Sequence, residues 1–226
     1  MPDELDLRRL RVHPSSMPIL FKTRGSATRD AAGMTATLIA IEFVSLDGVM
    51  QGLGSPDEDR DGGFEHGGWG ARFAPGIAET GAQGAAQATA YLFGRRTYDK
   101  MAAFWPTQPD SNPIAASLNS RPKYVASRTL REPQWAHTTV LGGPLADAIA
   151  ALKEGVDGHI AILGSGMLVH ELMALEMIDE LHLFVHPLLL GTGKRLFREL
   201  PRPRELELAD ITSSSLGTVV LRYTLR

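Results

Sequence analysis

The sequence contains no cysteine. Disulfides, thiolate nucleophiles and thiolate metal ligands are therefore excluded, because each needs a cysteine sulfur. Long apolar runs are also missing, since residues 181–190 include histidines and are too few to cross a bilayer. Near the N-terminus the apolar patch at 17–21 is broken by Pro18 and cannot act as a secretory signal. We therefore expect a cytoplasmic protein that does not enter a membrane.

The sequence has no excess of positive charge. Lysine and arginine number 23 against 26 acidic residues, which gives a formal net charge of -3. Because nucleic-acid binding usually needs a concentrated excess of basic residues, nucleic acid is not expected as the principal partner.

The content of hydrophobic residues, 43%, and of charged residues, 22%, is that of an ordinary globular protein. A chain of this length can form one domain with a full core.

The N-terminal part differs from the rest in composition. Residues 1–36 mix arginines, acids and prolines, and they show no sustained apolar period. We interpret them as a loose extension and expect residues 37–226 to form the domain. Because Met34 stands just before the first apolar run, we hypothesise that the natural product begins there.

The apolar patterns predict alternating strands and helices in one mixed sheet. A Gly-, Asp- and Pro-rich stretch at 51–76 predicts a long surface loop of the kind that closes over ligands. Two alternating segments at the C-terminus, 205–212 and 218–225, predict an antiparallel hairpin. The expected strands are 37–45, 90–93, 123–127, 138–141, 159–163 and 181–185, and the expected helices are 77–89, 95–103, 144–153 and 167–175.

Two strand-to-helix junctions have glycines where a ligand could approach the backbone. Gly94 is followed by Arg95 and Arg96, and a second junction has the sequence Gly-Ser-Gly at 164–166. The free amides and positive dipole end of a helix N-terminus attract phosphate, and arginine forks match phosphate oxygens. Neither junction has the G-x-G-x-x-G pattern, and the alternative that each glycine only closes a tight turn stays open.

A third junction, Ser127-Arg128-Thr129, offers hydroxyls and another guanidinium after the strand at 123–127. It is weak evidence alone. Open α/β sheets bind ligands at the carboxyl ends of their strands, where all three junctions are expected. Together they predict a dinucleotide site.

Other catalytic sites fail on spacing. Ser165 has glycines directly on each side, which is not the G-x-S-x-G spacing of a hydrolase nucleophile. The pair His170-Glu171 does not extend to H-E-x-x-H, because Ala174 stands at the last position. His182 and His186 are roughly 13 Å apart along a strand, too far for one metal ion. We expect no metal site and place these histidines at the core edge or the surface.

Several segments resemble the dihydrofolate reductase-like superfamily. They are FVSLDGVMQG, YLFGRRTYDKM, KYVASRTL and AILGSGMLVHELMALEMIDELHLFVHPLLLGTGKRLF. The resemblance covers about residue 38 to the C-terminus. It is closest to the C-terminal reductase domain of the bacterial bifunctional riboflavin-biosynthesis deaminase–reductase, here as a stand-alone member because no deaminase with zinc-ligand spacing is attached.

The resemblance implies an α/β dihydrofolate reductase-like fold. Its mixed sheet would be mostly parallel, with a C-terminal antiparallel hairpin and helices on both faces. It also implies an enzyme that binds NADPH. By matching motif, Gly94, Arg95, Arg96 and Thr97 would hold cofactor phosphates, Ser127 and Arg128 would lie near the adenosine ribose and its 2′-phosphate, and Gly164, Ser165, Gly166, Met167 and Leu168 would line the pyrophosphate and nicotinamide side. Asp47 would contact the substrate.

The implied reaction is hydride transfer to a small heterocycle, of the type of 5-amino-6-(5-phosphoribosylamino)uracil reduction. Dihydrofolate reductases present an acid on a helix after the first loop, and here Glu65 or Glu79 stands in no recognisable motif. A pteridine or dihydrofolate-type reductase is therefore an alternative, as is a non-catalytic NADPH-binding module.

Three further expectations remain open from the residues alone. Asp47 either orients the substrate or caps its own turn. Trp69, Phe73 and Trp105 either flank a planar ring or pack in the core. The apolar run at 184–190 could pair with its copy across a two-fold axis, so we expect a homodimer.

Overall fold

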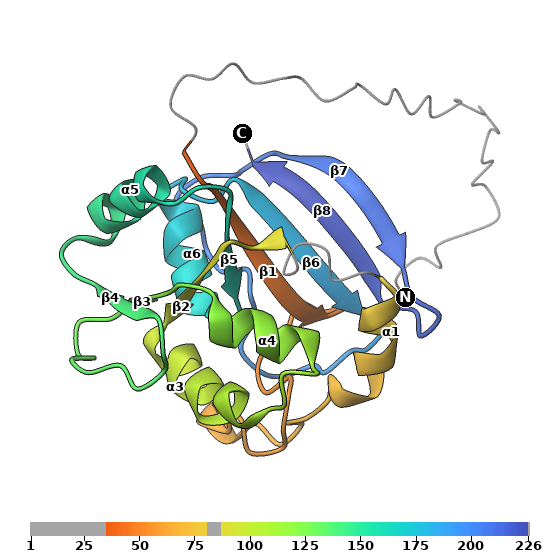
Figure 1. Ribbon diagram of the computed structural model, residues 1–226. Coiled ribbons are helices and arrows are strands. Elements are labelled where there is room, and N and C mark those ends of the chain that lie inside the picture. Colours follow the sequence, from red (N-terminus) through yellow and green to blue (C-terminus); the bar gives the residue numbers. More distant parts are fainter. Residues whose placement is uncertain (1–34, 81–86, 226) are drawn as a thin grey trace, which may run out of the picture. The chain divides into compact units, whose positions relative to one another are not determined.

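The computed structural model describes residues 35–80 and 87–225. Eight strands form one sheet in the order β4-β3-β2-β5-β1-β6-β8-β7 (Figure 1). They are β1 (Thr37–Ser45), β2 (Ala90–Gly94), β3 (Lys123–Ala126), β4 (Thr138–Leu141), β5 (His159–Leu163), β6 (Glu180–His186), β7 (Leu206–Ser213) and β8 (Val219–Leu225). The six strands β4, β3, β2, β5, β1 and β6 pair in parallel, each with its neighbours in this order. Strands β8 and β7 then add an antiparallel hairpin next to β6. The predicted mixed sheet is therefore confirmed.

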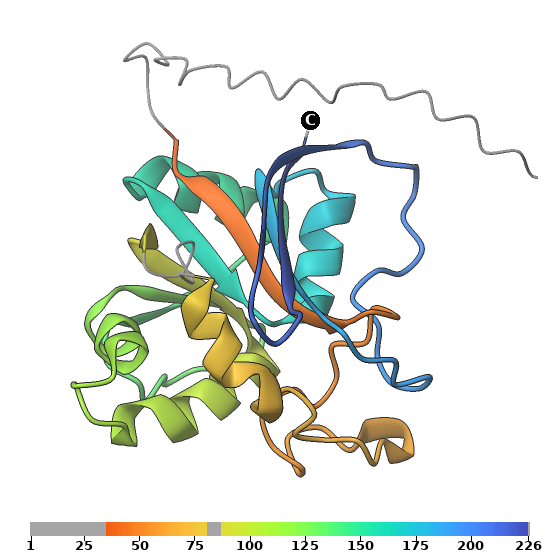
Figure 2. The same cartoon turned by 90° about the vertical axis from the view of Figure 1, so that its right-hand side faces the viewer.

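Helices cover both faces of this sheet, as predicted (Figure 2). They are α1 (Ala74–Glu79), α3 (Arg95–Phe104), α4 (Pro113–Ser120), α5 (Leu145–Gly155) and α6 (Gly166–Ala174). On one face α5 and α6 bury Ile149 and Leu172 against the sheet. On the other face α3 and α4 bury Tyr98 and Leu118. The sheet is thus enclosed between two apolar cores.

Strand β1 lies between two parallel neighbours, β5 and β6. Its sequence is almost wholly apolar because both of its faces are buried. Leu38 and Ala40 belong to the core of the α5 and α6 face, whereas Ile39 and Ile41 belong to the opposite core. Glu42 is the exception. Its side chain is buried to 1% exposure, and burial raises its pKa to about 8.

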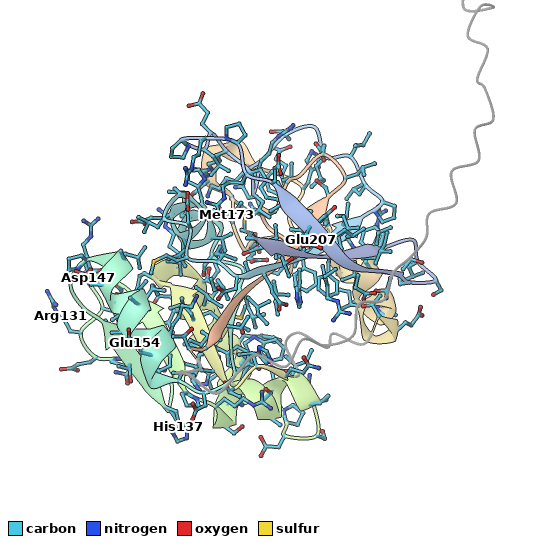
Figure 3. The ribbon with its side chains drawn as sticks, turned by 90° about the horizontal axis from the view of Figure 1, so that it is seen from above. Arg131, His137, Asp147, Glu154, Met173 and Glu207 are labelled. Carbon is cyan, nitrogen blue, oxygen red and sulfur yellow. The ribbon has the colours of Figure 1, made fainter. Side chains whose placement is uncertain are left out.

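Helix α5 shows the amphipathic pattern of a surface helix. Asp147 and Glu154 lie on its outer side (Figure 3), while Ile149 and Leu152 are buried beneath it. Within the described ranges, no helix combines the length and apolarity needed to cross a bilayer.

Some boundaries differ from the predictions. Helix α4 was not predicted; the Asn112 side chain caps its first amides and Pro113 opens it. The helix predicted over 77–89 is confirmed only in part: α1 runs from Ala74 to Glu79, residues 81–86 lie outside the described residues, and residues 88–89 are not helical. Of the predicted extension, residues 1–34 also lie outside them. Ala36 is buried, and its amide bonds to the Lys153 carbonyl at 2.7 Å, so it belongs to the fold.

Candidate active site

The predicted site residues follow strands that end at the same edge of the sheet. Because β1, β2, β3 and β5 run in parallel, their carboxyl ends lie together. Asp47 follows β1, and Gly94 ends β2. Ser127 follows β3, and Gly164 follows β5. The fold therefore brings the predicted junctions to one edge.

The junctions after β2 and β5 are joined directly. The Gly94 amide donates to the Ser165 hydroxyl oxygen at 2.9 Å. A methyl group on Gly94 would lie 3.5 Å from the Ser165 side chain, and one on Gly164 would lie 3.6 Å from Thr97. Ser165 holds this position in the left-handed region, with φ 66°, which is uncommon for a residue other than glycine. The starts of α3 and α6 are thus fixed side by side.

The first amides of these two helices have no side-chain cap. Gly94, the N-cap residue of α3, has no side chain to cap with, and Ser165, the N-cap residue of α6, makes no side-chain capping bond. In α4, by contrast, Asn112 accepts from the amides of Ile114 and Ala115. Uncapped N-terminal amides and the positive end of the helix dipole form an anion-binding site. Both junctions can therefore bind phosphate oxygens.

The three arginines near this edge differ in how they are engaged. Arg95 contacts Asp99 through two bonds from Nε, at 2.9 and 2.8 Å. Arg96 pairs with Asp61 at 2.9 Å, and its side chain is 83% exposed. Arg128 is exposed, and no acidic residue in the described part of the chain forms an ion pair with it. Arg128 is thus the one of the three whose guanidinium is free for a ligand.

Other predicted residues have structural roles. The Ser127 hydroxyl accepts from the amides of Thr129 and Leu130, at 3.2 and 3.0 Å, so it shapes the turn that presents Arg128. At the start of α6, the Met167 side chain is 64% exposed, whereas Leu168 is buried in the core. Any ligand contact of the Leu168 side chain is therefore blocked by packing.

Asp47 anchors a loop. Its carboxylate accepts hydrogen bonds from the Ser45 hydroxyl at 2.6 Å and from the amides of Leu190 and Gly191 at 3.1 and 2.9 Å. The Ser45 hydrogen bond is the largest cause that lowers the pKa of Asp47 to about 2; desolvation opposes it, and the backbone hydrogen bonds from Leu190 and Gly191 lower the pKa further. Asp47 is therefore a fixed negative charge and cannot serve as a proton donor near neutral pH.

The aromatic residues weighed as ring-binding groups pack internally. Phe73 stacks on the His186 ring at 4.6 Å between centroids, and Trp69 meets its edge at 5.6 Å. The Trp105 indole donates to the Met101 sulfur.

His186 is fully buried, and burial lowers its pKa to about 4, with the Arg72 charge a smaller cause. His182, 5% exposed, is also buried, so placing these two histidines at the core edge or surface was wrong.

Residues at this edge that the motifs did not select are Met50, Gln51 and Lys194. The Met50 thioether covers Gly166 so closely that a methyl group there would lie 2.1 Å from the sulfur. Lys194 forms ion pairs with Asp59 and Asp61 of the loop predicted to close over a ligand. The Gly-Thr-Gly-Lys sequence at 191–194 could have drawn attention to this lysine, because closely spaced glycines predict a tight loop; both glycines indeed have positive φ.

Comparison with known proteins shows which family and fold this chain resembles. The Bacillus subtilis (strain 168) protein YyaP is 27% identical over 135 residues, which cover 58% of this chain and 71% of YyaP. A putative riboflavin biosynthesis protein from Shewanella sp. PV-4 has a similar solved structure, with a TM-score of 0.59, 20% identity, and coverage of 84% of this chain and 99% of that one. Dihydrofolate reductase from Enterococcus faecalis, solved with NADP(H), gives a TM-score of 0.50, 14% identity, and coverage of 84% and 96%.

These solved structures show that the fold is dihydrofolate reductase-like. The sequence model of one family, described as the RibD C-terminal domain, matches residues 36–220, which is most of the chain. The chain therefore belongs to the RibD C-terminal domain family.

Proposed function

We propose that this chain is an NADPH-dependent reductase that transfers a hydride to a small heterocycle. A pyrimidine ribosylamine of the 5-amino-6-(5-phosphoribosylamino)uracil type is the substrate class that we favour. The observation that carries the proposal is the pair of uncapped helix starts, α3 and α6, fixed together by the bond between Gly94 and Ser165. Membership of the RibD C-terminal domain family supports it.

The residues at this edge fit a phosphorylated dinucleotide. The amides after Gly94 and Ser165 suit the pyrophosphate, because they are uncapped donors at positive helix ends. Glycine at 94 and 164 keeps the backbone open to close approach. Arg128, exposed after β3, suits the 2′-phosphate that distinguishes NADPH from NADH.

Bound NADPH would supply the hydride for an imine-like carbon of the substrate. The chain itself binds and orients the reactants. Asp47, as a fixed carboxylate, can accept a hydrogen bond from a substrate hydroxyl or amino group, but the proton that balances the hydride must come from another group or from water.

Of the two candidate acids for the pteridine alternative, Glu79 is already engaged. Glu79, on α1, accepts from the Ser215 amide at 2.9 Å and from its hydroxyl at 2.8 Å. The bonds from Ser215 lower the pKa of Glu79, so it is held as an ionised partner of the β7–β8 turn. Pterin recognition by Glu79 would require it to leave the hairpin, so the pteridine alternative depends on Glu65.

The experiment is NADPH consumption, followed by absorbance, across a panel of pyrimidine ribosylamine and pterin substrates. We expect turnover with a pyrimidine ribosylamine and weak inhibition by folate analogues. Turnover with pterins and tight inhibition by folate analogues would identify the pteridine reductase instead. Binding of NADPH without oxidation by any substrate would identify a non-catalytic module.

We also propose that the protein acts in the cytoplasm as a homodimer. Within the run predicted to form the interface, Phe184 and His186 are buried inside the domain, so its exposed apolar residues are Pro187 and Leu189, of which Leu189 is 70% exposed. Light scattering at micromolar concentration should give the mass of a dimer. A monomer mass would overturn the homodimer.

A further inference from the structure

Two cationic side chains from distant parts of the chain meet on one carboxylate oxygen. Arg96 Nη1 lies 2.9 Å from Asp61 Oδ2, and Lys194 Nζ lies 2.7 Å from the same atom. Arg96 belongs to the first turn of α3, and Lys194 follows β6. A guanidinium and an ammonium that converge on one oxyanion are the donors that proteins use to bind phosphate.

The charges of this cluster balance only while Asp61 is in place. Lys194 also contacts both carboxylate oxygens of Asp59, at 2.9 and 2.7 Å. Asp59 and Asp61 thus neutralise Lys194 and Arg96. If the Asp61 carboxylate moved away, Lys194 would keep Asp59 as its partner, and Arg96 would carry an uncompensated positive charge. The vacated position would favour another anion.

Gln51 fixes Asp59 and the backbone of Asp61 and Lys194, whereas the side chains of Asp61 and Arg96 remain exposed. Gln51, 4% exposed, donates from Nε2 to the Asp59 carbonyl and carboxylate and to the Asp61 carbonyl, and it accepts from the Lys194 amide. The Asp61 carboxylate itself projects from this anchor, and its side chain is 55% exposed. It can rotate into solvent without breaking a buried contact.

We propose that Arg96 and Lys194 form a phosphate-binding subsite and that Asp61 is its internal competitor, displaced when a phosphate group of the ligand binds. The uncapped amides at the start of α3, next to Arg96, lie beside this subsite and add donors for the same anion. The identity of the ligand rests on the proposed function. The phosphate comes from the cofactor or from a sugar-phosphate substrate, and these sources share the same chemistry.

The test is calorimetric titration of the full chain with NADPH, NADH and ribose 5-phosphate at low salt. Asp61→Asn removes the competitor. The phosphate-bearing ligand should therefore bind this variant about fivefold more tightly than it binds the parent, the size expected for an exposed ion pair. Lys194→Gln and Arg96→Gln should each weaken binding by a similar factor. Asp57→Asn is the matched control, because Asp57 lies in the same loop and pairs with Arg60 instead.

The pattern across ligands identifies the source of the phosphate. A gain in Asp61→Asn for NADPH and NADH alike assigns the pyrophosphate, a gain for NADPH alone assigns the 2′-phosphate, and a gain for ribose 5-phosphate assigns the substrate. In each case the gain should shrink as salt is added. Thermal unfolding of each variant identifies any loss of binding that comes from loss of the fold.

The inference and the proposed function fail in different ways. If the parent binds NADPH and Asp61→Asn binds all three ligands no more tightly than Asp57→Asn does, the subsite is overturned and the reductase proposal stands. If no form binds NADPH but Asp61→Asn gains affinity for ribose 5-phosphate, the subsite stands and the cofactor assignment fails. If no ligand binds any form, both are overturned.

Discussion

The Ser165 hydroxyl accepts a hydrogen bond from the Gly94 amide at 2.9 Å, although the two residues are 71 positions apart. This bond joins the ends of two adjacent parallel strands, β2 and β5. The Ser165 hydroxyl makes this bond and no capping bond to α6. The first amides of α3 and α6 are consequently left without a side-chain partner at the edge where a phosphorylated ligand would bind.

Ser165 should show separable effects of its hydrogen bond and of its backbone conformation. Ser165→Ala and Ser165→Gly both remove the hydroxyl, but only glycine relieves the left-handed backbone at φ 66°. We expect the glycine variant to be more stable than the alanine variant by about 1 kcal/mol, measured by urea unfolding. Equal stabilities would show that this conformation is not strained.

Gly193 should be far less tolerant of a side chain than Gly191. Both have positive φ, at 114° and 75°. A methyl group on Gly193 would lie 2.7 Å from Val49 Cγ1 and 2.8 Å from Phe64 Cε2, whereas one on Gly191 meets nothing within 4 Å. We expect Gly191→Ala to cost about 1 kcal/mol and Gly193→Ala about 2 kcal/mol or more in the free energy of unfolding. A similar cost for both would contradict this packing.

Two buried groups should make stability depend on pH in opposite directions. The pKa of Glu42 is raised from 4.5 to about 8, so the folded state binds more protons than the unfolded state between these values and stability falls as pH rises. The pKa of His186 is lowered from 6.5 to about 4, so stability rises with pH in that interval. From pH 6.5 to 7.5 Glu42 is the main contributor, because Lys123, whose pKa burial lowers from 10.5 to about 8, adds stability with rising pH only as the pH nears 8 and above.

Unfolding free energies measured in urea from pH 6.5 to 7.5 should therefore fall with pH, by at most about 1.4 kcal/mol per unit from Glu42. Glu42→Gln, which cannot ionise, should remove this slope. Glu154→Gln, which removes an exposed carboxylate on α5, is the control for a change in net charge. If Glu42→Gln kept the slope of the parent, Glu42 would not be the titrating group.

The local patterns predicted much of the fold. The apolar run at 37–45 and the glycine junctions at 94 and 164 could be recognised from the sequence. The apolar character of a buried strand and the glycines of a turn both depend on a few neighbouring residues. The helix α4 was missed because its short sequence, PIAASLNS, has weak periodicity and depends on the Asn112 cap.

The candidate site could be predicted only in part, since its decisive contacts are tertiary. That Asp47 holds the amides of Leu190 and Gly191 depends on pairing between segments about 143 positions apart. Likewise, nothing near Lys194 in the sequence indicates Asp61, 133 positions away. Motifs therefore located Gly94 and Arg96, while the structure was needed to show what each side chain touches.

The central claim is that this edge of the sheet binds NADPH, and dissociation constants for NADPH and NADH test it most directly. One charge-assisted hydrogen bond contributes about 1.5–3 kcal/mol, so the parent should prefer NADPH by roughly tenfold to a hundredfold. Arg128→Ala should lose most of this preference. Arg95→Ala should lose less, because Asp99 already engages that side chain. A parent that does not prefer NADPH, or an unchanged preference in Arg95→Ala, Arg96→Ala and Arg128→Ala, would contradict the assignment.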